Sequence, residues 1–231
     1  MLCYKGWLET RFKLLFTLGF VCLNLSMMHS YSSNIKTSVL LFMVTLMSQM
    51  MVMLACGMLA GAGINTQPTF QAAKGLHGST LFTLSLPVSR LRLLTVRACI
   101  GWLESVGFSA AFCCAMWFAS PLLRAKVAPF DLFKYALTLI VCSSAIYLLS
   151  VLLATFLDEI WRIWGTMIAA VALGWLSVHT YLPASFDFVR AIGKNSPLYT
   201  HTMPWSAMAF SLALSAAFFY AALKIAQARE Y

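Results

Sequence analysis

Long runs without a charged residue constrain this chain more than any other feature. Asp, Glu, Lys and Arg are absent from residues 14–35, 37–73, 105–123, 135–157, 163–186 and 195–223. A helix needs about 20 apolar residues to cross a bilayer core of about 30 Å, because lipid offers the backbone no hydrogen-bond partners. The apolar parts around these runs predict six spans, near residues 14–31, 39–63, 99–120, 135–157, 163–182 and 204–223.

Composition excludes a water-soluble fold. Hydrophobic residues make up 61% of the chain and charged residues 10%, against about 45–50% and about 25% in soluble domains. So few charges would not cover the surface of a soluble domain, and the same apolar content excludes a disordered chain. We therefore expect an all-α integral membrane protein in which residues 1–231 form a single transmembrane domain.

The N-terminal residues predict a helix that lies on the membrane before the first span. Tyr4, Trp7, Leu8 and Phe12 recur at helical spacing within residues 1–13, which is typical of a short interfacial helix. The run that follows has a basic start like a signal peptide, but no small-residue cleavage site comes after it. We therefore expect residues 14–31 to remain as a membrane helix.

The distribution of basic residues predicts the orientation. If the N-terminus is cytoplasmic, the predicted inner segments hold ten Lys and Arg residues and the outer segments hold six. Cytoplasmic segments of membrane proteins carry the excess of basic residues. We expect a multi-pass protein with both termini in the cytoplasm.

Residues 65–97 form the longest predicted cytoplasmic connection. One helical stripe contains Phe70, Ala73, His77, Leu81 and Leu84. Pro87 ends this run, and Ser89 can cap a new helix that begins near Arg90. A short amphipathic helix of this kind either docks a cytosolic partner or lies flat on lipid.

The motif within this connection resembles a known family. Gly78-Ser79, followed by a Leu-rich stretch and Leu86-Pro87-Val88-Ser89-Arg90, resembles the first cytoplasmic coupling segment of type-2 ATP-binding-cassette (ABC) exporter permeases, in which a Gly-Thr pair precedes the same Leu-Pro-Val-Ser-Arg ending. The layout of an interfacial helix, six spans and a long last outer loop is also similar to that family. The chain departs from the family pattern in having no acidic residue between positions 65 and 97.

The resemblance implies a permease domain with a coupling helix between the second and third spans. It implies docking to a separate ABC ATPase subunit through Lys74, His77, Gly78, Leu81, Leu84, Pro87 and Arg90. It also implies a homodimer or a pair with a similar permease, in contact with membrane lipid, in the bacterial plasma (inner) membrane.

The chain carries no motif for chemistry of its own. There is no G-x-x-x-x-G-K-[ST] phosphate loop, so ATP and its hydrolysis are expected on the partner subunit, and we expect no cofactor, no bound metal and no enzyme activity here. The net charge of +9 does not indicate nucleic-acid binding, because no basic surface interleaved with aromatic residues accompanies it.

Two further sets of charged residues are candidate contacts. Asp158, Glu159 and Arg162 lie in the predicted connection between spans four and five, where they either meet a cytosolic partner or form a solvated turn with a local Asp158–Arg162 pair. Glu104 lies at the predicted start of the third span. It either lines a path or contacts the second copy inside the membrane, or it sits at the headgroups.

Two functions therefore remain open. The first is the permease subunit of an ATP-driven exporter. The alternative is a proton-coupled secondary carrier that uses Glu104 as its titrating group. The transported substrate does not follow from the sequence, because path-lining and lipid-facing sides of such apolar helices look alike.

Overall fold

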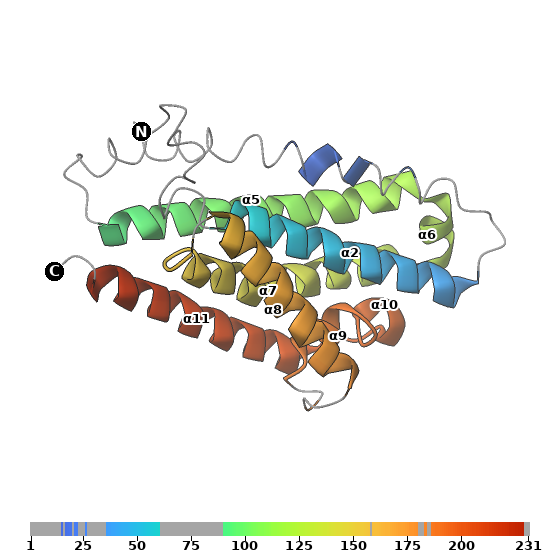
Figure 1. Cartoon of the computed structure of the whole chain (residues 1–231). Coiled ribbons are helices and arrows are strands. Elements are labelled where there is room, and N and C mark those ends of the chain that lie inside the picture. Colours follow the sequence, from blue (N-terminus) through green and yellow to red (C-terminus); the bar gives the residue numbers. More distant parts are fainter. Residues whose placement is uncertain are drawn as a thin grey trace.

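A computed structural model of the chain describes residues 15, 17–19, 21–22, 26, 36–60, 90–157, 159–179, 183 and 186–228. These residues form helices joined by turns, with no strand among them. The helices are α2 (Thr37–Leu59), α5 (Arg90–Ala119), α6 (Pro121–Lys126), α7 (Pro129–Leu153), α8 (Glu159–Val178), α9 (Phe188–Ile192), α10 (Pro197–Thr200) and α11 (Trp205–Ala228) (Figure 1).

Four of these helices are long and apolar enough to cross a membrane: Ser38–Leu59, Leu94–Ala119, Pro129–Leu153 and Trp205–Ala228. Large apolar side chains also point outward along the bundle, among them Phe118, Phe133 and Trp205, each more than 60% exposed. Soluble monomers rarely expose so many large apolar side chains, whereas lipid accepts them. The fold is that of an all-α membrane protein, as the composition predicts.

The four helices match four of the predicted spans, and two of the helices start ahead of the span predicted for them. Helix α5 begins at Arg90, where a helix start was predicted, ahead of the span expected from residue 99. Helix α7 begins at Pro129 rather than near residue 135, a limit that follows from treating Lys134 as a boundary. In α7 this was wrong, because Asp131 and Lys134 pair with each other inside the first turns of the helix.

The other two predicted spans are not among the candidate membrane-crossing helices of the described residues. The fifth, near residues 163–182, corresponds to α8, which is helical but is not among the four candidate spans. In the first, near residues 14–31, positions 15, 17–19, 21–22 and 26 are helical. The predicted interfacial helix at residues 1–13 and most of the coupling segment, residues 65–89, lie outside the described residues.

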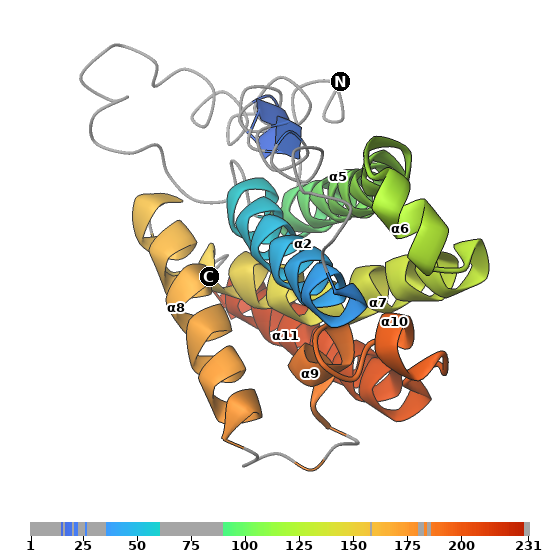
Figure 2. The ribbon, with the colours of Figure 1, turned by 90° about the vertical axis from the view of Figure 1, so that its right-hand side faces the viewer.

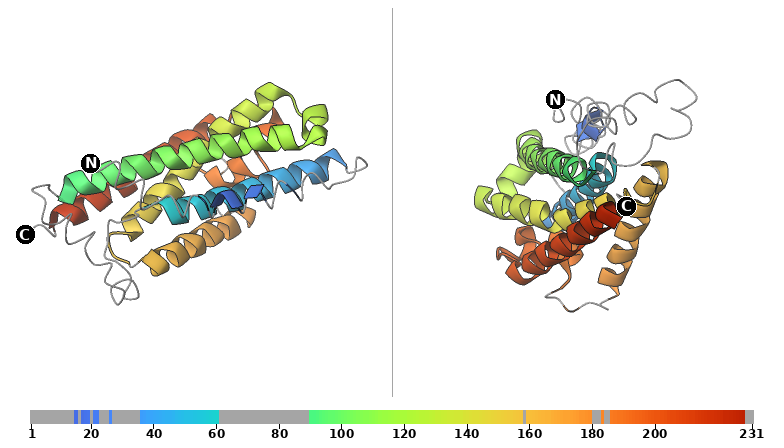
Figure 3. Two further views of the ribbon diagram at one scale, coloured as in Figure 1. Left: turned by 90° about the horizontal axis from the view of Figure 1, so that it is seen from above. Right: turned by 90° about the vertical axis from the view of Figure 1, so that its left-hand side faces the viewer.

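Helix α7 is the centre of the bundle. It contacts α2, α5, α8 and α11, and the end-on view shows these helices around it (Figure 2). Its inward side chains Tyr135, Leu139, Ile146 and Tyr147 are among the largest fully buried ones described. Helices α2 and α5 lie side by side along the same bundle (Figure 3).

Local sequence explains where the connections turn. Pro121 follows the end of α5, and the Ser120 hydroxyl accepts a hydrogen bond from the Leu123 amide at 3.3 Å, so a new helix, α6, starts at once. Pro129 occupies the first turn of α7 in the same way. The α5–α7 connection is therefore a short helical hairpin at one end of the bundle.

Helices α9 and α10 close that same end of the bundle, beside the starts of α2, α7 and α11 (Figure 1). The Asp187 carboxylate caps α9 by accepting a hydrogen bond from the Arg190 amide at 2.8 Å. Pro197 starts α10, and His201 ends it in the left-handed conformation with φ of 57°. The described residues between the last two predicted spans, near 163–182 and 204–223, are thus partly helical and pack onto the bundle.

Candidate functional site

Most of the predicted docking residues lie outside the described residues. They are Lys74, His77, Gly78, Leu81, Leu84 and Pro87, together with Asp158 of the second connection. Arg90 is the first residue of α5, which agrees with the predicted helix start near that position, and Glu159 is the first residue of α8.

Arg162 is buried, contrary to the expectation of a solvated turn. It is 2% exposed, and its guanidinium Nη2 donates to the Gly57 carbonyl of α2 at 3.4 Å. Thr166, one turn further along α8, donates from its hydroxyl to Ser150 of α7 at 2.8 Å. Both alternatives predicted for this connection, a contact with a cytosolic partner and a solvated turn, leave Arg162 at the surface, because they follow only from its neighbours along the chain. Arg162 instead ties the start of α8 to α2.

Tyr147 joins α7 to α5 in a similar way, through a hydrogen bond from its side chain to a backbone carbonyl. Its hydroxyl donates to the Ala98 carbonyl at 2.9 Å, and both groups are buried. At Gly101 an added Cβ would lie 2.4 Å from the Tyr147 hydroxyl oxygen and 3.0 Å from the Leu59 carbonyl oxygen. The glycine is therefore required for the close approach of three helices at this level.

Glu104 lies one turn beyond Gly101 on α5. It is half-buried and ten residues inside the candidate span that begins at Leu94, which is about 15 Å along a helix. Glu104 and Arg162 both lie near enough to the Tyr147 hydroxyl to interact with it electrostatically. Of the two positions expected for Glu104, this depth favours the interior of the span over the headgroups.

These residues form one largely buried cluster, which we call the Arg162 cluster: Gly57, Ala98, Gly101, Glu104, Tyr147 and Arg162. It lies near the end of α2 and near the starts of α5 and α8. Neighbouring polar groups are also paired: Trp102 Nε1 donates to the Ser144 hydroxyl at 3.1 Å, and Cys56 Sγ lies 3.7 Å from the Ser105 hydroxyl. In an apolar medium such pairs hold helices together, because an unpaired polar group is costly there.

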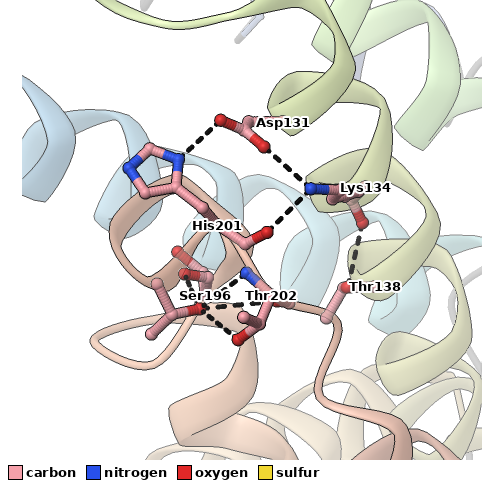
Figure 4. Close-up of polar contacts among 7 residues, drawn as sticks. Asp131, Lys134, Thr138, Ser196, His201 and Thr202 are labelled. Carbon is pink, nitrogen blue, oxygen red and sulfur yellow. Dashed lines mark hydrogen bonds and ion pairs between the residues drawn. The ribbon is translucent and has the colours of Figure 1, made fainter.

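A second polar cluster fixes the opposite end of the bundle (Figure 4). The Asp131 carboxylate lies 2.6 Å from His201 Nδ1 and accepts a hydrogen bond from Lys134 Nζ at 3.0 Å. The same ammonium donates to the His201 carbonyl at 2.7 Å. The cluster joins the start of α7 to the turn after α10. The i,i+3 spacing of Asp131 and Lys134 is visible in the sequence, but the role of His201 is not.

No group of three or more His, Cys, Asp and Glu residues in the described part of the chain is placed to hold a metal ion. Comparisons with protein-family models, with curated proteins and with solved structures found no match for this chain.

The Arg162 cluster predicts a specific response to substitution at Gly101. Gly101→Ala forces the new methyl group against the Tyr147 hydroxyl, and overpacking of this kind costs about 1–3 kcal/mol. This exceeds the gain in helix propensity from Gly to Ala, up to about 1 kcal/mol. We expect a lower melting temperature of the detergent-purified protein, measured by fluorescence-detected size-exclusion chromatography.

The matched control is Gly107→Ala on the same helix, where no described residue lies within 4 Å of an added Cβ. We expect it to leave the melting temperature equal or higher. In a Tyr147→Phe background the hydroxyl is gone, so Gly101→Ala should destabilise less. Equal losses in both backgrounds would show that the α5–α7 contact does not limit the packing.

Proposed function

We propose that this chain is the membrane-spanning permease subunit of an ATP-driven exporter that docks a separate ABC ATPase. The observation that carries the proposal is the Gly78–Arg90 motif with its Leu86-Pro87-Val88-Ser89-Arg90 ending, whose last residue is the first residue of α5. Four apolar helices of spanning length are compatible with a permease. The absence of a phosphate-loop motif in the chain is consistent with ATP hydrolysis on a partner.

The proposed mechanism transmits movement through residues 65–97, which follow α2 and include the first turns of α5. Nucleotide-bound and nucleotide-free ATPase would hold this segment differently, and that difference shifts the permease between inward-open and outward-open states. Leu59 at the end of α2 and Ala98 near the start of α5 both take part in the packing around Gly101 and Tyr147. A displacement of the segment would therefore reach α7 through Tyr147 and α8 through the Gly57–Arg162 contact.

We test docking with a single charge placed on the predicted helical stripe. Leu81→Asp, or deletion of residues 75–85, should abolish co-purification of the ATPase subunit, because a carboxylate replaces the apolar side chain expected in the contact. Thr83→Asp, which adds the same charge off the stripe, is the control and should retain the ATPase. Full retention of the ATPase by both Leu81→Asp and the deletion would refute the docking role.

We also propose that α8 is a membrane span and that residues 14–31 form another, giving six spans with both termini in the cytoplasm of a bacterium. Support for α8 comes from its exposed face, where Trp161 and Trp164 lie near one end and Trp175 near the other, with Ile168 and Val171 between them. Tryptophan is enriched at both membrane–water interfaces.

Reporter fusions test this topology. Alkaline phosphatase, which is active only outside the cytoplasm, should be active when fused after Lys126 or Lys194 and inactive when fused after Ala228. Green fluorescent protein should give the opposite pattern. If α8 does not cross the membrane, the fusions after Lys126 and Lys194 should report opposite sides.

We assign the same exposed face of α8 to a second copy of the permease. Trp161, Trp164, Ile168, Val171 and Trp175 follow a 3-4-3-4 spacing and are each more than half exposed. This spacing gives a straight apolar seam, as between helices that pack along their length. A photo-crosslinking residue at position 168 should give a dimer-sized product, whereas one at Leu212 of α11 should not. Dimer formation from position 212 alone would place the interface elsewhere.

The alternative function is a proton-coupled carrier, which the depth of Glu104 within its span favours. Transport by the purified chain in liposomes, driven by a pH gradient without an ATPase and abolished by Glu104→Gln, would support this alternative. Transport that needs both the ATPase and ATP would support the exporter.

A further inference from the structure

A groove of about 830 Å³ lies between the first half of α2, the end of α8 and the α9–α10 segment. This volume is within the range of about 300–1,000 Å³ that is typical of small-molecule sites. The residues that line it include Phe42, Leu46, Gln49, Gly174, Arg190 and Lys194. None of them belongs to the Arg162 cluster or to the predicted docking segment.

The polar end of the groove is a fixed structure. Asp187, 1% exposed, accepts a hydrogen bond from the Ser177 hydroxyl at 2.9 Å and lies 3.4 Å from Arg190 Nε. A further hydrogen bond joins the Arg190 guanidinium to the Ser177 carbonyl. Gln49 Nε2 donates to the Val189 carbonyl at 3.2 Å, so α2, α8 and α9 are joined around this end.

The charge of this end is positive. Arg190 and Lys194 both line the groove, and no Asp or Glu is among the described residues that line it. Asp187 neutralises one of these charges from behind Arg190, which leaves the exposed Lys194 as the net charge at the groove. The side chain of Asn195 adds amide donors at the same place.

The rest of the groove is apolar and open. Phe42 is 55% exposed and Leu46 is 37% exposed, and both line it from α2. On the facing helix, none of the residues that the structure describes comes within 4 Å of where a Cβ would be at Gly174. The absence of a side chain at this position keeps the groove open along α8.

We propose that this groove binds an amphiphile with an anionic headgroup, such as an anionic phospholipid or a fatty acid. The headgroup phosphate or carboxylate would lie at Lys194 and Arg190, and the acyl chain would lie along Phe42, Leu46 and Gly174. A wholly apolar ligand would leave the cationic end unmatched, and a small free anion would leave the apolar part empty. The proposal does not depend on the exporter function, because the groove is built from this chain alone.

Two variants of the full-length protein test the two halves of the groove separately. Gly174→Phe places a ring in the open space along α8, and Lys194→Gln removes the net charge while leaving a side chain of similar length. Their controls are Gly107→Phe, at a second glycine with open space on α5, and Arg124→Gln, at another exposed cation of the same end of the bundle.

The measurement is the binding of phosphatidylglycerol with a fluorescent acyl chain to protein in a zwitterionic detergent, with phosphatidylcholine of the same chain as the comparison lipid. We expect Gly174→Phe to weaken phosphatidylglycerol binding by about tenfold or more, which corresponds to about 1.4 kcal/mol. Lys194→Gln should weaken it about fivefold, since one Lys near a membrane surface contributes about 1 kcal/mol to anionic-lipid binding. Both controls should bind like the unsubstituted protein.

Competition separates an amphiphile from its headgroup alone. Oleate should displace the fluorescent lipid, whereas inorganic phosphate at millimolar concentration should not. The proposal is overturned if phosphate displaces the lipid fully, if phosphatidylcholine binds as tightly as phosphatidylglycerol, or if Lys194→Gln has no effect. Lys194 is an exposed surface residue, so this last variant remains informative even if Gly174→Phe proves poorly folded.

Discussion

The hydrogen bond from Tyr147 to the Ala98 carbonyl is the contact on which the packing of this bundle depends. It brings α7 against α5 deep inside the apolar interior, and it requires Gly101, because a methyl group there would meet the Tyr147 hydroxyl at 2.4 Å and the Leu59 carbonyl at 3.0 Å. The end of α2 is therefore held at the same level. Lipid does not drive helices together as water does, so close approach at small residues and polar pairs between helices have to provide the association.

The charged groups inside the bundle follow the same constraint. Arg162 is buried, yet its guanidinium reaches the Gly57 carbonyl, and Asp131 is 7% exposed, yet it faces both Lys134 and His201. In each case a charge that would be costly alone lies beside polar partners from another element. Each of these charges therefore fixes one helix end relative to a neighbouring element. Arg162 does so for α8 against α2, and Asp131 does so for α7 against the turn after α10.

This pattern explains what could be predicted from the sequence. The membrane class and the approximate positions of α2, α5, α7 and α11 follow from the long charge-free runs, because lipid excludes unpaired charges over most of a span. The start of α7 could not be placed in this way. Asp131 and Lys134 come just before the charge-free run 135–157, but they lie within the helix, where they pair with each other. Arg162 was expected at the surface, against a cytosolic partner or in a solvated turn, for a related reason, since its partner Gly57 is 105 residues away.

The groove has no signal in the sequence, because its walls come from three separate parts of the chain: residues 38–49, 174–177 and 189–199. Even so, it follows from the contacts already described. Helix α8 is attached to α2 at one end through Arg162 and Gly57, and at the other end indirectly, through Ser177, Asp187 and the Gln49–Val189 contact of the α9 segment. Between these attachments Gly174 presents no side chain, so a gap remains between the two helices. An amphiphile bound in the proposed groove would therefore contact α2 and α8 between the two attachments that hold these helices together.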